Sequence, residues 1–133
     1  MSPRLLATCL ALCLLCAHAA ADPPYMKVDE VRGGMKGVVR TVLKGTEVED
    51  IPVEVVDVLR KVAPGRDVVI IRLEGEKAQR WGVAQGMSGS PVYVNGRLLG
   101  ALSFAWRFVK EPLAGVTPAS TSLSGGVIPR SRC

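Results

Sequence analysis

The dipeptide Asn95-Gly96 constrains the fold of this chain most strongly, because it lies between two short apolar segments. Residues 91–94 precede it and residues 98–102 follow it. Both central residues of a type I′ hairpin turn need a positive φ, which Asn and Gly adopt at the least cost. The pattern therefore predicts two antiparallel strands joined by a tight turn.

Three segments upstream of this hairpin are rich in β-branched residues and also predict strands. They cover residues 38–43, 51–62 and 68–73. In the second segment, the consecutive residues Val55 and Val56 break the alternation of inward and outward side chains, which predicts a bulge or a bend. No segment shows a sustained 3.6-residue apolar stripe. We therefore expect an all-β fold with short hairpins, a small barrel or part of one.

The first twenty-one residues have the pattern of an export signal. Arg4 supplies a positive charge, residues 5–16 form an uninterrupted apolar run, and residues 17–21 provide a small-residue cleavage site. The apolar run is too short to cross a bilayer core of about 30 Å as a helix. We expect residues 1–21 to be removed, which leaves a periplasmic or secreted protein without a stable membrane anchor.

Cleavage after Ala21 would change the inventory of reactive side chains. It removes 21 of the 133 residues, including the only histidine, His18, and leaves Cys133 as the single cysteine. Without Arg4 the 17 basic residues become 16, against 12 acidic ones, and the two kinds are interspersed. These features predict no nucleic-acid partner, no metal or other cofactor, and no intramolecular disulfide.

One motif indicates chemistry, and it lies directly before the predicted hairpin: residues 86–91, with the sequence Gly-Met-Ser-Gly-Ser-Pro. Ser88 stands between glycines, so a tight turn can present its hydroxyl for attack. The amides of Gly86 and Ser88 can then converge on a developing oxyanion. The alternative is a loop whose hydroxyl groups bond only to the local backbone, and we expect Ser90 to be such a turn residue.

The motif and its hairpin resemble the nucleophile region of chymotrypsin-like serine peptidases, and most closely that of the SpoIVB-type serine peptidases. The matching segments are residues 24–31, 34–37, 41–42, 45–46, 53–55, 64–67, 86–94, 96–101, 110–112 and 115–118. The resemblance implies a peptidase domain over residues 22–118, with a small or partial chymotrypsin-like barrel. It implies that Ser88 is the nucleophile and that a polypeptide is the substrate. We expect the domain to be incomplete, because a double barrel needs a longer chain.

The catalytic base is not assigned by this resemblance. The family uses a histidine on the N-terminal side of the serine, oriented by an acidic residue, whereas residues 22–133 contain no histidine. Asp67 is the acid that we consider first, although a turn residue in Pro-Gly-Arg-Asp is the interpretation we favour. Lysine serves as the base in some serine enzymes, but the sequence does not distinguish Lys77 from Lys110.

Three functional hypotheses stay open: an exported serine endopeptidase, a non-catalytic cell-envelope binding or scaffolding module of the same fold, and a truncated fragment. Residues 119–133 lose the apolar pattern and predict an irregular tail. A frameshift or a premature stop after Pro118 would explain why the resemblance ends there. The endopeptidase hypothesis implies a polypeptide substrate as the partner, whereas the binding-module hypothesis implies an envelope protein.

Two further expectations concern side chains outside the motif. Ser103 is a candidate for the substrate cleft by analogy. The few large aromatic residues are expected in the core, with a substrate-facing patch as the alternative. They are Trp81, Phe104, Trp106 and Phe108.

Overall fold

The computed structural model describes residues 24–84, 86–106 and 110–124, with the side chains of residues 122–124 excluded. The predicted export signal, the aromatic residue Phe108 and the last nine residues of the predicted tail lie outside the described residues. Within them, no helix is long and apolar enough to cross a membrane.

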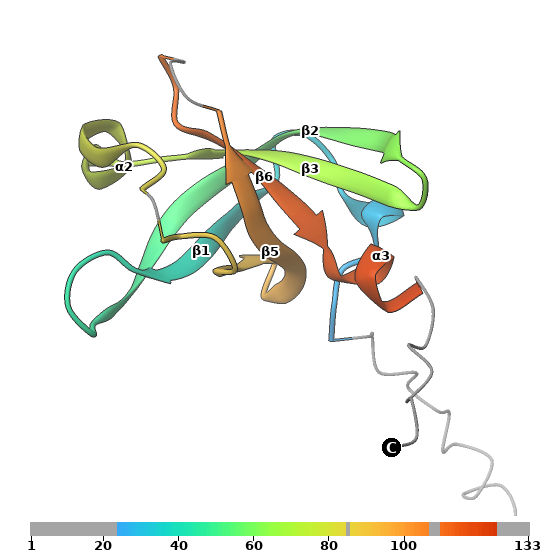
Figure 1. Ribbon diagram of the computed structural model, residues 1–133, viewed down its shortest axis with the longest axis horizontal. Coiled ribbons are helices and arrows are strands. Elements are labelled where there is room, and N and C mark those ends of the chain that lie inside the picture. Colours follow the sequence, from blue (N-terminus) through green and yellow to red (C-terminus); the bar gives the residue numbers. More distant parts are fainter. Residues whose placement is uncertain (1–23, 85, 107–109, 125–133) are drawn as a thin grey trace, which may run out of the picture.

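Six antiparallel strands close into a barrel, in the order β1-β2-β3-β6-β5-β4 (Figure 1). Short helices lie before β1, between β3 and β4, and after β6. The elements are η1 (Val28–Glu30), β1 (Lys36–Val42), β2 (Val48–Ala63), β3 (Arg66–Leu73), α2 (Glu76–Trp81), β4 (Pro91–Val94), β5 (Arg97–Ala105), β6 (Leu113–Pro118) and α3 (Ala119–Ser124). The all-β prediction and the prediction of a small barrel are confirmed.

Small β-branched side chains fill the interior of the barrel. Alternate residues of each strand face inward, so the strands supply a core that suits a narrow barrel. The side chains with less than 2% exposure include Val39, Val53, Val55, Val69, Ile71, Val92, Val94, Leu99 and Val116. This interior is a packed apolar core, as a narrow barrel filled by its own side chains requires.

The predicted hairpin and the predicted bulge are both present. Asn95 has a φ of 51° and Gly96 a φ of 74°, as a type I′ turn between β4 and β5 requires. The pairing of β2 with β3 shifts register between Val55 and Asp57. Val56 therefore points out of the barrel and is exposed. Both features follow from local sequence, since the φ preference and the broken alternation belong to neighbouring residues.

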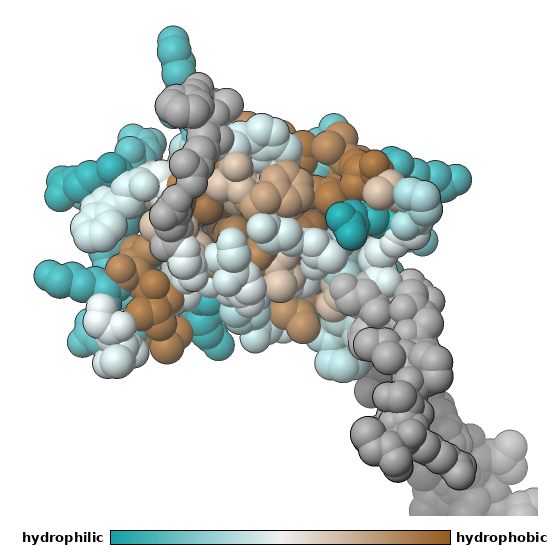
Figure 2. Space-filling model, in the orientation of Figure 1, coloured by the Kyte–Doolittle hydropathy of each residue, from teal (hydrophilic) through white to brown (hydrophobic). Residues whose placement is uncertain are grey.

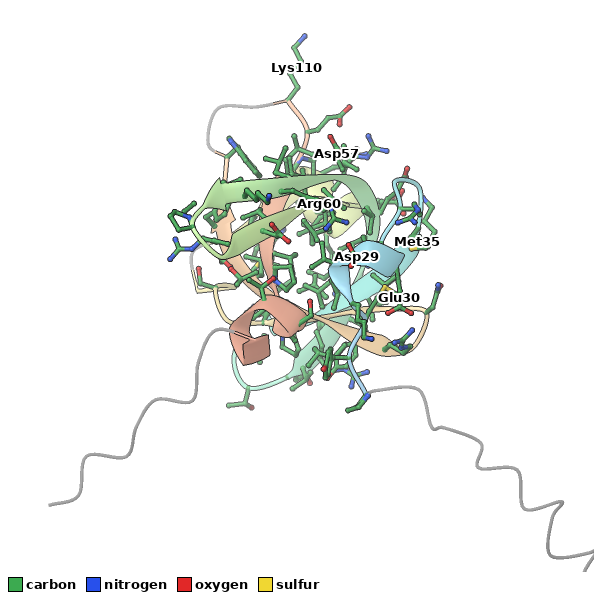
Figure 3. All side chains as sticks on the ribbon, turned by 90° about the vertical axis from the view of Figure 1, so that its right-hand side faces the viewer. Asp29, Glu30, Met35, Asp57, Arg60 and Lys110 are labelled. Atoms are coloured by element: carbon green, nitrogen blue, oxygen red, sulfur yellow. The ribbon has the colours of Figure 1, made fainter. Side chains whose placement is uncertain are left out.

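The β2–β3 hairpin extends past the end of the barrel. In this hairpin, β2 exposes the apolar side chains of Val56, Leu59 and Val62. Figure 2 shows the apolar surface over the hairpin. Near the turn of this hairpin, Arg60 Nη1 lies 2.8 Å from Asp29 Oδ1, which ties β2 to η1 (Figure 3). The N-terminal segment thus packs against the outside of the barrel at this end.

The sequence did not predict the two α-helices, α2 and α3. Each has only six residues, which is too short for a 3.6-residue apolar pattern to be recognised. The irregular tail predicted for residues 119–133 differs from the structure over residues 119–124, which form α3 and contact β5 and β6. α2 begins after Gly75 and ends before Gly82, which both have a positive φ.

Candidate functional site

Ser88 lies in the turn between α2 and β4, and its side chain is exposed. The glycines on either side of it, Gly86 and Gly89, have φ values of 97° and 87°. A Cβ at either position would meet no atom within 4 Å, so the backbone conformation and not the available space requires glycine there. The two glycines therefore set the tight turn that the sequence motif predicted.

The amide groups of this turn fall into two sets. The N–H groups of Met87, Gly89 and Ser90 donate to backbone carbonyl oxygens at distances of 2.6 to 3.3 Å. The N–H groups of Gly86 and Ser88 donate to no acceptor among the described residues. Among the described residues, the amide on the serine itself and the amide two residues before it therefore have no hydrogen-bond acceptor.

Two contacts with the barrel hold the turn in place. The Ser90 hydroxyl donates to Thr41 Oγ1 on β1 at 2.8 Å. Thr41 is 5% exposed and is the one buried polar side chain among the described residues. On the other side of the turn, the Met87 side chain is 1% exposed and belongs to the core. Because Met87 and Ser90 are anchored in the barrel, Ser88 between them is presented to solvent.

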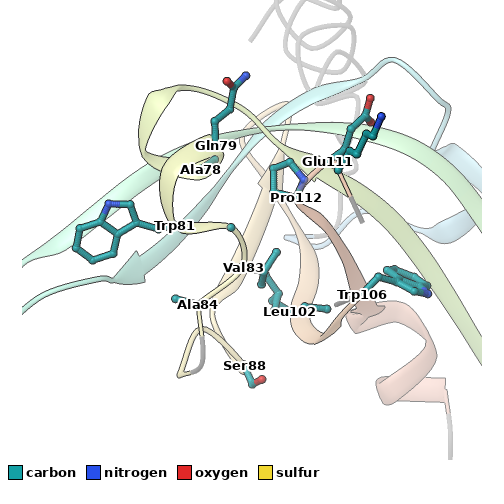
Figure 4. Close-up of a pocket in the computed structure, with 13 residues that line it drawn as sticks. Ala78, Gln79, Trp81, Val83, Ala84, Ser88, Leu102, Trp106, Glu111 and Pro112 are labelled. Carbon is teal, nitrogen blue, oxygen red and sulfur yellow. The ribbon is translucent and has the colours of Figure 1, made fainter. Parts of the chain in front are cut away.

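A hollow of about 740 Å³ opens beside Ser88 at this mouth of the barrel (Figure 4). Four segments between residues 78 and 112 form it: α2 with the loop after it, the Ser88 turn, the end of β5, and residues 110–112. Its apolar lining consists of Ala78, Val83, Ala84, Leu102, Ala105 and Pro112, with Trp81 and Trp106 on opposite sides. No local sequence signal indicates this hollow, since its walls meet only when the barrel closes.

The aromatic residues correct an expectation from the sequence. Trp81, Phe104 and Trp106 are 53%, 41% and 38% exposed, so the prediction that they belong to the core is wrong. Phe104 and Trp106 pack edge to face with their ring centroids 4.9 Å apart. The Phe104 ring covers Gly115, where a Cβ would clash with it. Both tryptophans line the hollow, as the alternative of a substrate-facing patch requires.

Asp67 lies at the β2–β3 turn and not beside Ser88. Its Oδ1 accepts a hydrogen bond from the Lys61 amide at 2.8 Å, and its Oδ2 lies 4.0 Å from Arg60 Nη1. It lines a separate hollow that includes Thr121 after β6. No contact among the described residues links Asp67 to Ser88, and its hydrogen bond stabilises the turn in which it lies.

The two lysines considered as bases have different surroundings. Lys77 forms an ion pair with Glu49 on β2. Lys110 lines the hollow, but its side chain extends away from the barrel (Figure 3). Within the described part of the chain, no side chain forms a hydrogen bond with the Ser88 hydroxyl. Neither lysine therefore takes the position of a base on Ser88.

Ser103 lies on β5, at the register shift between Leu102 and Phe104. Its hydroxyl is bonded to the Thr117 hydroxyl and accepts a hydrogen bond from the Thr117 amide at 3.1 Å. It does not line the hollow beside Ser88. The hydroxyl of Ser103 therefore joins β5 to β6.

A network of ion pairs positions one wall of the hollow. Arg72 on β3 lies 3.1 Å from Glu111 at the rim and 3.1 Å from Glu54 on β2. Lys36 on β1 lies 2.7 Å from both Glu54 and Glu74. Hydrogen bonds from Lys36 and Arg72 hold the pKa of Glu54 below its ordinary value, and the two carboxylates raise the pKa of Arg72. Across residues 24–124, as far as they are described, no cluster of His, Cys, Asp and Glu side chains forms a metal site.

A closed antiparallel barrel with an exposed, glycine-flanked serine at its mouth is the arrangement of a chymotrypsin-like serine peptidase barrel. The family model described as SpoIVB peptidase S55 matches residues 19–118, about three quarters of the chain. The chain therefore belongs to the SpoIVB peptidase family, and the resemblance predicted from the sequence is confirmed. No curated protein and no solved structure matches the chain.

Proposed function

We propose that this chain is an exported serine endopeptidase domain of the SpoIVB type, with Ser88 as its nucleophile and a polypeptide as its substrate. The observation that carries the proposal is the pair of amides on Gly86 and Ser88 that have no acceptor among the described residues, next to an exposed hydroxyl. In this mechanism Ser88 Oγ attacks the carbonyl carbon of the scissile peptide bond. Each amide that donates to the resulting oxyanion lowers the barrier by about 3–4 kcal/mol.

The proton of the Ser88 hydroxyl has no acceptor among the described side chains. General-base catalysis contributes a factor of about 10² to 10⁴ to such a reaction. We therefore expect this chain to attack ordinary peptide bonds slowly and to react more readily with strongly electrophilic phosphonates. Asp67 has no part in the proposal, because its carboxylate is bonded within the β2–β3 turn.

A fluorophosphonate probe tests the nucleophile directly. Purified protein from residue 22 onward is treated with the probe and its intact mass is recorded, alongside the variants Ser88→Ala and Ser90→Ala. We expect a single adduct that is lost in Ser88→Ala and retained in Ser90→Ala. The absence of any adduct on protein shown by circular dichroism to be folded would overturn the proposal.

The second candidate function is a polypeptide-binding module in the cell envelope that does not turn over its ligand. The observation that favours it is the absence of histidine from residues 22–133, together with a hollow beside Ser88 that is lined by both apolar and polar side chains. Peptide binding in the Ser88→Ala variant and no adduct in the wild type would be the result that selects this function.

Export is the remaining part of the proposal. Expression of the full chain in a bacterium, followed by fractionation and N-terminal sequencing, should give a periplasmic or secreted product that begins at Asp22. A cytoplasmic product that retains residues 1–21 would contradict it.

A further inference from the structure

We propose that the tip of the β2–β3 hairpin, residues 59–66, docks reversibly on the surface of an anionic phospholipid bilayer. The inference goes beyond the proposed function and does not depend on Ser88. The hollow beside Ser88 and the hollow at the hairpin tip share no lining residue. The contact is peripheral, and no segment of the chain crosses the bilayer in it.

The hairpin tip lies outside the barrel. β2 pairs with β1 only as far as Glu54, and β3 pairs with β6 only from Val69 onward. Among the described strands, residues 56–68 therefore pair only within the hairpin, which projects at one end of the molecule (Figure 1). A projecting hairpin can touch a flat surface while the barrel keeps all its own contacts.

A bulge shapes the tip. Three residues of β2, 60–62, lie opposite the single residue Asp67 of β3. Within this bulge Lys61 has a φ of 53°, which is uncommon for a residue other than glycine. Asp67 Oδ1 accepts a hydrogen bond from the Lys61 amide at 2.8 Å, which stabilises this conformation. The bulge interrupts the strand pairing, and the side chains of Lys61 and Val62 are both exposed there.

The tip exposes apolar side chains. Leu59 is 37% exposed and Val62 is 49% exposed, and Pro64 in the turn is exposed as well. Figure 2 shows the apolar surface of the hairpin with hydrophilic side chains next to it. Transfer of such side chains from water to the boundary between headgroups and acyl chains is favourable.

The charges of the tip complement an anionic surface. Residues 59–66 include three basic residues and no acidic one. Arg60 is paired with Asp29 at 2.8 Å, whereas Lys61 and Arg66 form no ion pair with any described residue. Lipid phosphate groups attract such cations, and acyl chains cover the apolar side chains beside them. One partner therefore suits both kinds of side chain.

The turn between β1 and β2 shows that apolar exposure alone does not distinguish the tip. Its paired residues Val42 and Val48 are 44% and 63% exposed, and it lies at the opposite end of the molecule (Figure 1). Residues 43–50, however, carry one lysine and three acidic residues. An anionic surface would repel this turn and attract the hairpin tip.

The same charges disfavour other occupants of the tip. In a dimer formed through two tips, Lys61 and Arg66 of one copy would face the same cations of the other, and like charges in an interface are costly. An acidic polypeptide would neutralise the cations but offers no apolar partner for Leu59 and Val62. An anionic bilayer provides both.

The experiment is a co-sedimentation titration of phospholipid vesicles with protein from residue 22 onward, which includes the whole described barrel. One set of vesicles is phosphatidylcholine alone, and the other contains equal parts of phosphatidylcholine and phosphatidylglycerol. Each cation near an anionic surface contributes a factor of about five, so two predict about 25-fold tighter binding to the anionic vesicles. Sodium chloride should weaken this preference, because salt screens the charges.

Two pairs of substitutions at the tip separate the apolar contribution from the charged one. Leu59→Ser combined with Val62→Ser should weaken binding to the anionic vesicles at least about tenfold. Lys61→Gln combined with Arg66→Gln should reduce it to the level measured with neutral vesicles. All four side chains are exposed, and thermal melts followed by circular dichroism confirm that the variants are folded.

Matched controls make the same chemical changes elsewhere on the surface. Val42→Ser combined with Val48→Ser replaces two exposed valines of the turn between β1 and β2. Lys44→Gln combined with Arg80→Gln replaces two exposed cations that form no ion pair with any described residue. Both controls should bind the anionic vesicles as the wild type does.

Several outcomes would overturn the inference. Equal binding to both kinds of vesicle, or equal losses in the tip variants and the controls, would refute docking through the tip. A dimer in analytical ultracentrifugation that the serine substitutions at the tip abolish, without vesicle binding, would assign the tip to a second copy. Binding of polyglutamate without vesicle binding would assign it to an acidic polypeptide. Phosphonate labelling of Ser88 is measured separately, so failure of the proposed function would not affect these results.

Discussion

Replacement of Thr41 by valine tests whether the Ser90–Thr41 hydrogen bond holds the Ser88 turn on the barrel. The substitution preserves the shape of a side chain that is 5% exposed and suits a strand, but it removes the acceptor of the Ser90 hydroxyl, 2.8 Å away. A typical hydrogen bond contributes about 0.5–1.5 kcal/mol net, and a buried donor without a partner costs about 1–3 kcal/mol. Ser90 is half-buried, so we expect the free energy of unfolding to fall by about 1–2 kcal/mol.

Urea denaturation of the wild type, Thr41→Val, Ser90→Ala and the double variant measures this effect. If the two hydroxyl groups act together, the double variant should be less destabilised than the sum of the single variants, by about 0.5–1.5 kcal/mol. Thr46→Val, in the exposed turn between β1 and β2, is the control and should change stability by no more than about 0.5 kcal/mol. Equal effects at positions 41 and 46, or strict additivity in the cycle, would refute this reasoning.

Three further predictions concern the ion-pair network, the serine turn and the core. Because the pKa of Glu54 is lowered in the folded state, its contribution to stability is present above the ordinary carboxyl pKa and is lost as the pH falls through the lowered value. The urea midpoint of the wild type should therefore fall more between pH 6 and pH 3 than that of Glu54→Gln, and parallel curves would contradict this. Gly86→Ala places a side chain at a φ of 97°, so it should lower the free energy of unfolding by about 1–3 kcal/mol. It should also slow phosphonate labelling of Ser88. Labelling at the wild-type rate in the folded variant would argue against the turn geometry. Leu99→Ala, at a fully buried position, should cost about 2–5 kcal/mol by calorimetry or urea titration, and a loss below 1 kcal/mol would show that the barrel interior is not packed.

Several features were predictable because they depend on residues adjacent in the sequence. Asn95 and Gly96 prefer the positive φ that the hairpin needs, and the consecutive residues Val55 and Val56 cannot both point into a pleated sheet. The turn around Ser88 belongs to the same group, since its flanking glycines allow the observed backbone. In each case the physical cause lies within three or four consecutive residues, so a short sequence motif predicts the feature.

Other features could not be predicted because they depend on which segments meet when the barrel closes. Trp81 and Trp106 are apolar enough for a core, and only the closed barrel places them at its mouth, on either side of one hollow. For Asp67 the sequence left a catalytic acid and the favoured turn residue open, and the hydrogen bond from the Lys61 amide to its carboxylate fits the turn residue.

The sequence by itself determined five of the six strands, the hairpin and the serine turn, because period-two patterns and φ preferences are local properties of the chain, and its motifs carried the resemblance to the family. The strand β6 was not predicted. The tertiary structure alone decided what surrounds Ser88. Within the described residues, the amides of Gly86 and Ser88 lack an acceptor because the neighbouring amides take the nearby carbonyl groups. The hollow beside Ser88 depends on four segments between residues 78 and 112. Such contacts form when the barrel closes, because closure brings together side chains that have no regular spacing in the sequence.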